Sequence, residues 1–429
     1  IQYNPDTGKN ELVDYPKLTD LASYSAANYP YITPDNARAA ATAYTAYKNN
    51  ESLSQDQIDI LNSALNIVLP TGVESLKEGI FSGLDAEGNA VAGESANTDI
   101  NTITTNGLDE IEPYTFAGCN KLIGAYINGD TAKLGDYAFK DCTALTDVDI
   151  LSSLDEFGVR PFAGCGQLSD VSFGNNPNYT CEQAVIYGTD NGTKTSLLEV
   201  LESRGLTYGT GTLTKQELAG ITAVAEEAAK NCDGILSADF SETTVKELPV
   251  SVFEDTDELY SVILPDGIRK IAKNAFKNSN IRYLEIPKSL SVIDNSAFDE
   301  DPQTITFYCE ADSAAADYAS SFSNIVVSDK PVTFKVTFYD DDAVTVLDTV
   351  EVPAGGNAET HITPTKAGYV FKGWMPEPVG VMEDMKTYAT YVPEGEVTYT
   401  VQFVDHDDTV LSSQIVPAGG TAVTPVSPE

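Results

Sequence analysis

The chain has 429 residues, enough for one large core or several domains, and 42% of them are hydrophobic, which excludes overall disorder. Its 65 acidic residues outnumber its 25 Lys and Arg residues, and the formal net charge of −40 argues against nucleic acids and anionic membranes as partners, since both are polyanions. No run of 18 apolar residues occurs, so no transmembrane helix is predicted. A start at Ile1 without an apolar leader suits a secreted protein whose signal peptide has been removed, or a sequence that begins late.

Residues 1–70 carry two helix signals. Thr33-Pro34 suits a helix start, because Thr caps the first turn and Pro is tolerated at the first helical position. Ser54 and Gln57 form a capping box before four apolar residues at helical spacing, Ile58, Leu61, Leu65 and Val68. We expect an N-terminal helical cap that shields the domain after it. The alternative is a separate helical pair that binds a partner.

A recurring pair of positions dominates residues 71–328. An apolar residue is followed five positions later by Phe or its replacement, in the pairs Leu76/Phe81, Ile111/Phe116, Leu134/Phe139, Phe157/Phe162, Val224/Ala229, Leu248/Phe253, Ile271/Phe276 and Ile293/Phe298. The second members are 35, 23, 23, 67, 24, 23 and 22 residues apart. A period near 23 predicts a solenoid, in which each repeat forms one coil and stacks on the next.

The segment from Leu134 to Ile150 shows one complete unit, LGDYAFKDCTALTDVDI. Its end alternates like a strand with its apolar side inward, and one strand per coil builds a parallel sheet. The stretches YAFKDCTAL, RPFAGCGQL, NAFKNSNI and LPDGIRKIAKNAF resemble the BspA-type leucine-rich repeats of bacterial surface proteins, over about residues 70–325. The resemblance implies an α/β solenoid, a right-handed leucine-rich-repeat fold exposed outside the cell.

Three departures from the period carry structural expectations. Ala229 replaces Phe, which predicts a locally thinner core filled from a neighbouring coil. An insertion near 84–106 is small, polar and Gly-rich, so a flexible excursion is expected. An insertion near 174–215 has two apolar runs around a Gly/Asp/Asn turn, which predicts a β-hairpin or, alternatively, a degenerate coil.

Four of the six cysteines occupy one repeat position: Cys119, Cys142, Cys165 and Cys232. Neighbouring coils are about 4.8 Å apart, so a disulfide is conceivable on distance alone. Side chains stacked in parallel do not point at each other, which favours buried reduced thiols. The wide spacing argues against a C-x-x-C metal site.

The C-terminal region begins where the last repeat runs into FYCEADSAAADYASSF, which predicts a short closing helix. Residues 332–393 alternate as strands and contain Gly368-Tyr369-x-Phe371-x-Gly373-Trp374. This segment resembles the Listeria–Bacteroides repeat, which implies a small β-grasp-like module serving as a stalk or spacer, with Trp374 in its core. Residues 398–429 repeat only half of it, so we expect a poorly ordered tail or an edge strand that pairs between chains.

The sequence offers little for catalysis. His361 and His406 are its only histidines, and neither has a nucleophile nearby in sequence. Phosphate-binding Gly loops and H-E-x-x-H motifs are absent, and no carboxylate pair is singled out for glycoside hydrolysis. We therefore predict no catalytic residues and no cofactor. The run Asp340 to Asp342 indicates a charged hairpin tip.

The outward positions of the predicted sheet carry the candidate binding residues. If Val148 and Ile150 point inward, Asp147 and Asp149 point outward, and the same register places Asp170, Asp239 and Glu285 outward on later coils. Such a column of like charges is either solvated, which is the simpler interpretation, or bridged by a basic ligand or Ca²⁺. Tyr126 and Tyr283 also lie outward and are the candidate aromatic contacts.

These observations lead to one function hypothesis and two alternatives. The resemblance implies a secreted or cell-surface bacterial protein, and we expect it to bind a host or matrix protein, or a glycan, through its solenoid without catalysis. The alternatives are a purely structural stalk and a hydrolase hidden in the insertions. The fold alone does not decide among them.

Overall fold

The computed structural model describes residues 2–13, 34–49, 51–92, 94, 96, 98–208, 211–298, 304–381, 383–394, 398–404 and 410–417. The chain divides into two compact units, residues 1–329 and 330–429, which are taken separately. The finer predicted boundaries, at residue 70 and between 393 and 398, stay predictions.

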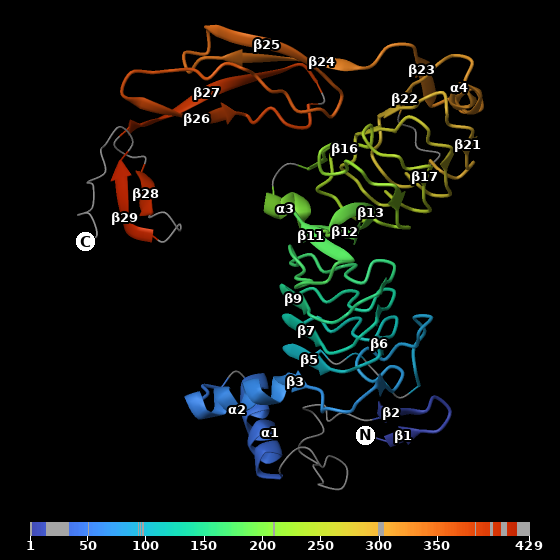
Figure 1. Ribbon diagram of the computed structural model, residues 1–429, viewed down its shortest axis with the longest axis vertical. Helices are drawn as coiled ribbons and strands as arrows, with labels where there is room; N and C mark the ends of the chain where they lie inside the picture. Colours follow the sequence, from blue (N-terminus) through green and yellow to red (C-terminus); the bar gives the residue numbers. More distant parts are fainter. Residues whose placement is uncertain are drawn as a thin grey trace. The chain divides into compact units, whose positions relative to one another are not determined.

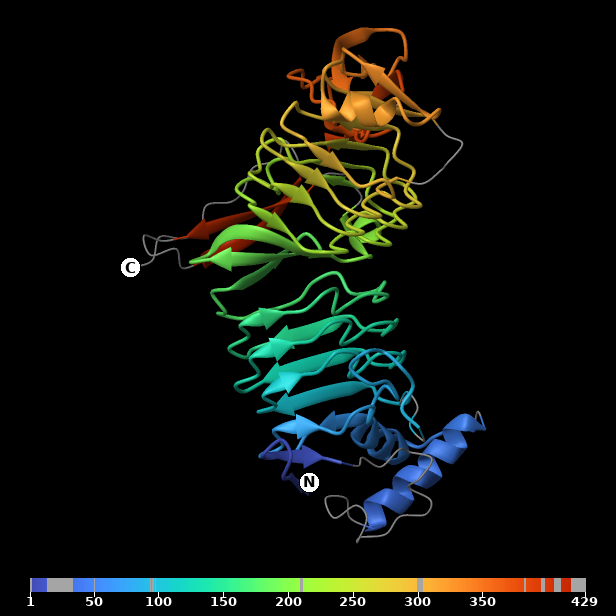
Figure 2. The ribbon, with the colours of Figure 1, turned by 90° about the vertical axis from the view of Figure 1, so that its right-hand side faces the viewer.

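The first unit is a solenoid in which each coil adds one strand to a front sheet and a two-residue strand to a rear ladder (Figure 1, Figure 2). In its N-terminal half the front sheet is wholly parallel and consists, in order, of β3 (Asn66–Val68), β5 (Thr102–Asn106), β7 (Gly124–Asn128) and β9 (Asp147–Ile150). The rear ladder is a parallel sheet of β6 (Glu110–Ile111), β8 (Lys133–Leu134) and β10 (Glu156–Phe157), and β4 (Ser75–Leu76) occupies the same repeat position in a separate small sheet. The first member of each predicted pair ends one of these short strands, which confirms the period.

The core between front sheet and rear ladder is a stack of phenylalanine rings. Phe81, Phe116, Phe139 and Phe162 follow one another with ring centroids 5.2, 5.0 and 5.6 Å apart. The predicted cysteine column lies against this stack, and its thiols donate to backbone carbonyl oxygens of the preceding coil. Cys142 Sγ, for example, lies 3.2 Å from Phe116 O. The six cysteines all lie in the described part of the chain and remain thiols, as the parallel stacking favoured.

Each of six coils turns at a residue with positive φ, three positions after its apolar residue: Tyr114, Tyr137, Arg160, Glu227, Ser251 and Asn274. The N–H of this residue bonds to the next coil in most of them, as Tyr137 N does to Val159 O at 3.0 Å. Non-glycine residues rarely adopt this conformation, so the stacking of coils is what holds it.

The N-terminal region contains both predicted helices. Helix α1 (Pro34–Lys48) begins at the predicted proline, while Thr33 lies outside the described residues. Before α2 (Gln55–Leu65), Ser54 N donates to Gln57 Oε1 at 2.9 Å and Gln57 N donates to Ser54 Oγ at 3.3 Å, which confirms the capping box. The helix stops before Val68, however, and that residue lies in β3.

A hairpin precedes the helices where only a helical cap was predicted. It consists of β1 (Gln2–Asn4) and β2 (Lys9–Leu12), and β2 pairs in parallel with β4, so that Leu12 enters the solenoid core. The apolar residues of the helices cluster instead around Ala40, Ala43 and Tyr44. Shielding of the first coil by the helices therefore stays a prediction.

The first insertion is shorter than predicted, because Thr102–Asn106 forms strand β5. Its beginning is a closed turn, in which Asp85 Oδ1 accepts the N–H groups of Glu87 and Asn89 at 3.0 and 2.7 Å. The predicted flexibility of this segment stays a prediction.

The second insertion contains the predicted hairpin. Strands β11 (Tyr179–Glu182), β12 (Val185–Asp190) and β13 (Thr193–Val200) form an antiparallel sheet, and Asn191 and Gly192 have the positive φ values that a tight hairpin turn requires. Strand β13 also pairs in parallel with β15 (Ala223–Val224) and so continues the rear ladder. With α3 (Arg204–Tyr208) and β14 (Thr212–Leu213) it completes a coil, so the degenerate coil predicted as an alternative is present too.

This hairpin divides the solenoid core in two. Ile186 belongs to the apolar cluster of the N-terminal half, whereas Val185 and Tyr187 belong to that of the C-terminal half. Strand β12 is therefore buried on both faces and separates the two cores.

The C-terminal half repeats the same plan. Its front sheet has the parallel order β14, β16 (Ser237–Asp239), β18 (Ser261–Ile263), β20 (Tyr283–Glu285), β22 (Ile305–Tyr308) and β23 (Ile325–Ser328), and its rear ladder contains β17 (Glu247–Leu248), β19 (Lys270–Ile271) and β21 (Val292–Ile293). Phe253, Phe276 and Phe298 stack at 5.7 and 5.1 Å. In the coil of Ala229 the stack lacks a ring at this position, and Phe240 of the same coil lies edge-on to Phe253 with ring centroids 6.3 Å apart. Filling of the coil from a neighbour stays a prediction.

The predicted closing helix is confirmed as α4 (Ala314–Ala319), with Ser313 as its N-cap. Ala315 and Ala319 are buried in the core of the C-terminal half. The ring of Tyr318 lies 6.1 Å from Phe298 and 6.4 Å from Phe307, so the helix covers the last coil.

The second unit contains a four-stranded sheet of order β25-β24-β27-β26, built from β24 (Thr333–Tyr339), β25 (Val346–Pro353), β26 (Tyr369–Met375) and β27 (Met385–Pro393). Trp374 packs against Phe338 and Phe371 at 4.8 and 5.2 Å, in agreement with its predicted place in the core. Asp342 Oδ1 accepts two N–H groups in the β24–β25 turn, which confirms the hairpin tip. Residues 354–368 form turns and bends, so the β-grasp designation stays a prediction.

The start of the predicted second module forms a two-stranded sheet. Strands β28 (Thr398–Val404) and β29 (Val410–Pro417) are antiparallel. His406 and residues 418–429 lie outside the described residues, so the predicted disorder and pairing between chains stay predictions.

Candidate functional site

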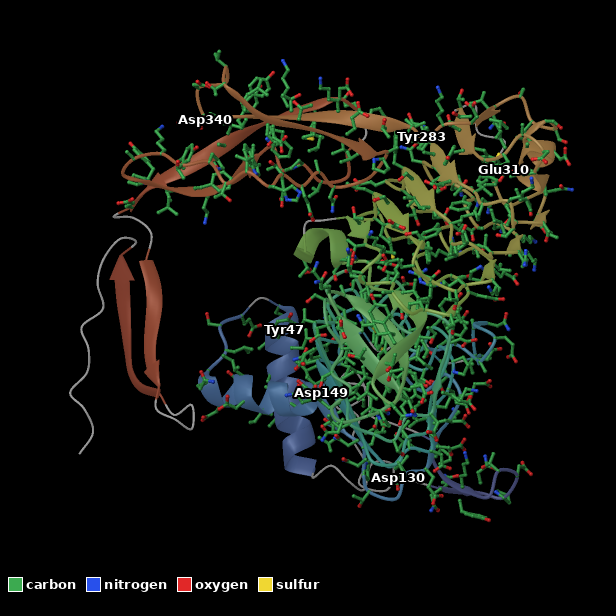
Figure 3. All side chains as sticks on the ribbon, turned by 45° about the horizontal axis from the view of Figure 1, so that its top comes forward. Tyr47, Asp130, Asp149, Tyr283, Glu310 and Asp340 are labelled. Carbon is green, nitrogen blue, oxygen red and sulfur yellow. The ribbon has the colours of Figure 1, made fainter. Side chains whose placement is uncertain are left out.

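The predicted outward residues do point out of the core, but they do not form one column. Asp147 and Asp149 alternate with buried Val148 and Ile150. The front sheet of the N-terminal half ends with a bridge between Asp149 and Ser172, just after Asp170, which is exposed. Asp239 and Glu285 belong to the other front sheet, beyond the hairpin. The predicted continuous acidic column is therefore wrong, because the hairpin interrupts the sheet (Figure 3 labels Asp149 and Tyr283, one from each half).

In the N-terminal half, Tyr126 lies along its own strand over Gly124. A Cβ at Gly124 would meet Tyr126 Oη at 2.9 Å and the ring carbons at 3.2 Å, so only glycine leaves room for the ring in this position. The Tyr126 hydroxyl donates to Asp147 Oδ2 at 2.7 Å, on the strand beside Gly124. This bond, together with burial, raises the pKa of Tyr126. The predicted residues Tyr126 and Asp147 thus form one fixed unit.

The positions around this ring are mostly uncharged. Thr104 pairs with Tyr126 across the strands, Thr102 pairs with Gly124, and Asn106 pairs with Asn128. All four of these polar residues are half-buried, while the residues between them point into the core. The face combines an aromatic ring with hydroxyl and amide groups, and its charge lies on the side of Asp147 and Asp149.

In the C-terminal half, Tyr283 packs against Tyr260 with ring centroids 5.3 Å apart. Glu285, on the same strand, lines a surface cavity of about 290 Å³ together with Asp266, Tyr308, Glu310 and Asp329. Burial raises the pKa of Glu285, and the nearby charges of Asp239 and Asp266 raise it further. This cavity brings Glu285 together with acidic residues that the sequence analysis did not select.

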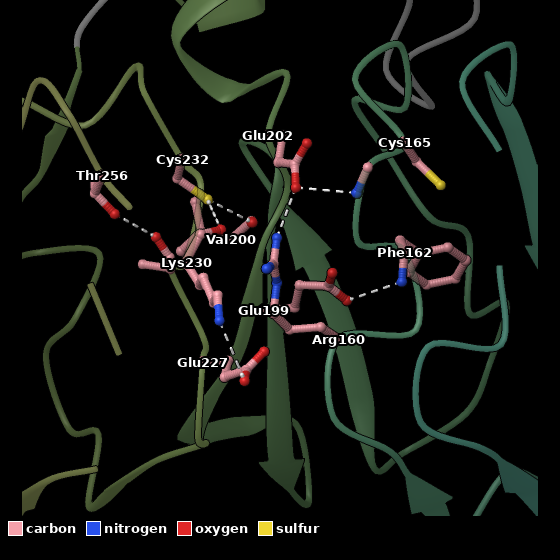
Figure 4. A network of polar contacts seen from close by, with 12 residues as sticks. Arg160, Phe162, Cys165, Glu199, Val200, Glu202, Glu227, Lys230, Cys232 and Thr256 are labelled. Atoms are coloured by element: carbon pink, nitrogen blue, oxygen red, sulfur yellow. Dashed lines mark hydrogen bonds and ion pairs between the residues drawn. The ribbon is translucent and has the colours of Figure 1, made fainter. Parts of the chain in front are cut away.

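A second polar cluster is buried between the two cores (Figure 4). Arg160 is only 2% exposed, and its Nη2 lies 2.7 Å from Glu202 Oε1. The same oxygen accepts the N–H of Gly164 at 3.0 Å. Glu199 is also buried and accepts the N–H of Phe162 at 3.5 Å. We call Arg160, Glu199 and Glu202 the junction cluster.

A further hydrogen bond joins the two halves of the solenoid. Tyr137 Oη donates to Glu227 Oε2 at 2.6 Å, although the two residues are 90 positions apart in the sequence. Burial raises the pKa of Glu199 to about 8, although the Arg160 charge lowers it. Arg160 Nε has no hydrogen-bond partner among the described residues. The junction cluster therefore holds two halves of the solenoid together with buried charge. A signal was present in the sequence, because Arg160 is the one basic residue among the six at its repeat position, and Glu227 is the one acidic residue.

Metal binding by the acidic residues of the front sheet stays a prediction. Within the part of the chain that the structure describes, one group of three carboxylates has oxygens within 4.8 Å of one another: Glu78, Asp85 and Glu87. None of these residues was a candidate, and Asp85 already accepts backbone N–H groups. His361 is exposed and is not part of this group.

Comparison with known protein families agrees with this geometry. Residues 59–188 and 210–327, more than half of the chain, match the BspA type leucine rich repeat region in six copies. The chain belongs to the BspA-type leucine-rich repeat family. The interval between the two matched segments falls on β13 and α3, where the hairpin interrupts the BspA-type coils. Residues 334–398 match the Listeria–Bacteroides repeat domain.

Several solved structures resemble this BspA-type protein at low identity. The pneumococcal vaccine antigen PcpA is 14% identical over 62% of this chain and 79% of that chain, with a TM-score of 0.42. A leucine rich cell surface protein from Faecalibacterium prausnitzii is 16% identical over 62% and 88%, with a TM-score of 0.28. A leucine-rich repeat protein from Eubacterium ventriosum is 15% identical over 68% and 88%, with a TM-score of 0.30. No curated protein matches the chain.

None of the described helices is both long enough and apolar enough to cross a bilayer.

Proposed function

We propose that this BspA-type protein is a non-catalytic binding scaffold displayed outside a bacterial cell, which captures a partner on the front sheet of its solenoid. Membership in a family of bacterial surface repeat proteins supports the location. The observation that carries the binding role is the Tyr126–Asp147 unit, an aromatic side chain held in place by a hydrogen bond on an open sheet face. A structural stalk requires only the inward residues that hold its coils together. A stalk alone therefore does not explain an outward aromatic side chain that a hydrogen bond holds in place.

The Listeria–Bacteroides module has a separate role in this proposal, that of a spacer. It is a small sheet with its own aromatic core, so it can fold without contributing to the front sheet. Catalysis is not part of the proposal, because the described residues of the front sheets include no histidine. Two thiols lie near their carboxylates, Cys181 and Cys309, and burial raises the pKa of both, which keeps them protonated.

The test is a binding screen with the complete 429-residue chain on an array of extracellular-matrix proteins and oligosaccharides. We expect retention of at least one probe, and loss of that retention when the chain is unfolded by heat before application. An array on which the folded chain retains nothing above the unfolded chain contradicts the binding scaffold and favours the structural stalk.

A further inference from the structure

The Tyr126 side chain is held in one conformation by contacts within the protein itself. Its hydroxyl is fixed by Asp147 and Gly124 leaves space beneath it, so the ring lies along the strand and presents one face outward. A side chain already held in one conformation loses little entropy on binding. Nothing in the folding of the coil requires this arrangement, because the core positions beside it, Ala125 and Ile127, are filled without it.

The surroundings of the ring indicate the chemistry of its ligand. The hydroxyls of Thr102 and Thr104 lie on the same face, because Thr102 pairs with Gly124 and Thr104 pairs with Tyr126 on the adjacent strand, about 4.8 Å away. Asn128 lies two residues further along the strand of Tyr126, on the side away from Gly124. An aromatic face is electron-rich and attracts weakly positive C–H groups, and hydroxyls and amides both donate and accept hydrogen bonds. A sugar ring offers the complement of both, with C–H groups on its faces and hydroxyls at its edge.

The acidic residues around this face favour a neutral sugar over an acidic sugar or a basic peptide. Asp147, Asp149 and Asp170 border the face and repel acidic sugars, in a chain whose net charge is −40. A basic peptide finds a stronger site in the acidic cavity around Asp266 and Glu285. Resting on the proposed function, we infer that the face around Tyr126 binds a neutral oligosaccharide, with one sugar ring stacked on the Tyr126 ring and its hydroxyls bonded to Thr102 and Thr104.

The experiment applies the complete chain to an array of neutral hexose and N-acetylhexosamine oligosaccharides, with sialylated and sulfated counterparts and matrix proteins on the same slide. We expect retention on neutral oligosaccharides and at least a tenfold weaker signal for Tyr126→Ala. Gly124→Ala keeps the tyrosine but places a methyl group where the ring lies, so it is expected to weaken binding to a similar degree. Tyr126→Phe keeps the ring without its hydrogen bond and is expected to weaken binding only a few-fold.

The matched control is Tyr47→Ala, which removes a 50% exposed tyrosine of α1, outside the front sheets, and is expected to leave binding unchanged. Unchanged melting midpoints for all four variants exclude misfolding as the cause. Retention on neutral oligosaccharides that survives Tyr126→Ala overturns the inference, and so does retention on acidic oligosaccharides or proteins alone, although the binding scaffold then stands. Retention on no probe contradicts both.

Discussion

Arg160 Nη2 lies 2.7 Å from Glu202 Oε1 at the point where the phenylalanine stack of the N-terminal half ends. Glu202 lies two residues after β13, the last strand of the inserted hairpin. Apolar contacts of Ala184, Ile186 and Leu201 join this segment to the N-terminal core, and the ion pair and hydrogen bonds of the junction cluster add to them. We expect the buried Arg160 side chain to make the junction cluster sensitive to substitution.

Removal of Arg160 is expected to destabilise the first unit strongly. Arg160→Ala removes a buried side chain and leaves the partly buried Glu202 without its ion-pair partner, and breaking a buried pair costs about 3–5 kcal/mol. Urea denaturation followed by circular dichroism measures the loss. The control is Lys270→Ala, which breaks an ion pair whose two side chains are each 45% exposed and is expected to cost less than about 1 kcal/mol. Equal losses in the two variants contradict a special role for the junction cluster.

Glu199 gives the unfolding free energy a dependence on pH. Burial raises its pKa from the ordinary 4.5 to about 8, so the folded chain keeps a proton that the unfolded chain releases. The stability that this proton supplies is fully present below pH 4.5 and is lost as the pH rises to about 8. Melting midpoints from pH 5 to 9 are expected to fall, and Glu199→Gln is expected to flatten the fall.

The control for that experiment is Glu156→Gln, since the Glu156 side chain is 70% exposed. It is expected to leave the slope between pH 5 and 9 unchanged. If Glu199→Gln and Glu156→Gln give the same profile as the unmodified chain, the carboxyl of Glu199 is already ionised in the folded state.

Glu254 is expected to act in the opposite direction at acid pH. Burial alone raises its pKa, but hydrogen bonds from Lys277, Ser251 and Lys230 outweigh this and lower the pKa from 4.5 to about 2. Its contribution to stability is therefore present above pH 4.5 and is lost as the pH falls towards 2. Denaturation at pH 2.5, 3.5 and 5 measures this loss, and Glu254→Gln is expected to reduce it. A Glu254→Gln variant that keeps the full acid sensitivity shows that other carboxylates cause it.

The inward half of the solenoid could be predicted from sequence because it repeats. Leu134 and Phe139 recur at fixed spacing, and burial selects the same residue types in every coil. The hairpin was predictable from its own alternation and its Asn191-Gly192 turn. The position of β12 between two cores was not predictable, because a strand that is buried on both faces shows no alternation of polar and apolar residues. The acidic column failed for the same reason, since counting from Asp149 to Asp239 assumed an uninterrupted sheet.

The candidate site was predictable only in part. The register of Tyr126 and Asp147 followed from the alternation, and the structure places both outward. Their hydrogen bond depends on Gly124, whose meaning appears only when the ring is seen to lie over it. Arg160 and Glu202 are 42 residues apart, and an insertion of irregular length brings them together. The repeat period therefore does not predict their contact.

Restoring phenylalanine to the coil that lacks it is expected to destabilise the protein. The sequence period makes Ala229→Phe look favourable, but Ala229 is completely buried, and Phe240 of the same coil already contributes a ring beside Phe253. Inserting a larger side chain into a filled core forces strained packing and costs about 1–3 kcal/mol. Urea denaturation measures the change, with Ala132→Phe at an exposed position as the control. Because that control adds the same side chain without crowding a core, its unfolding free energy is expected to change by less than about 0.5 kcal/mol. A rise in stability for Ala229→Phe means that the coil has an unfilled space at the phenylalanine position and that Phe240 does not replace the missing ring.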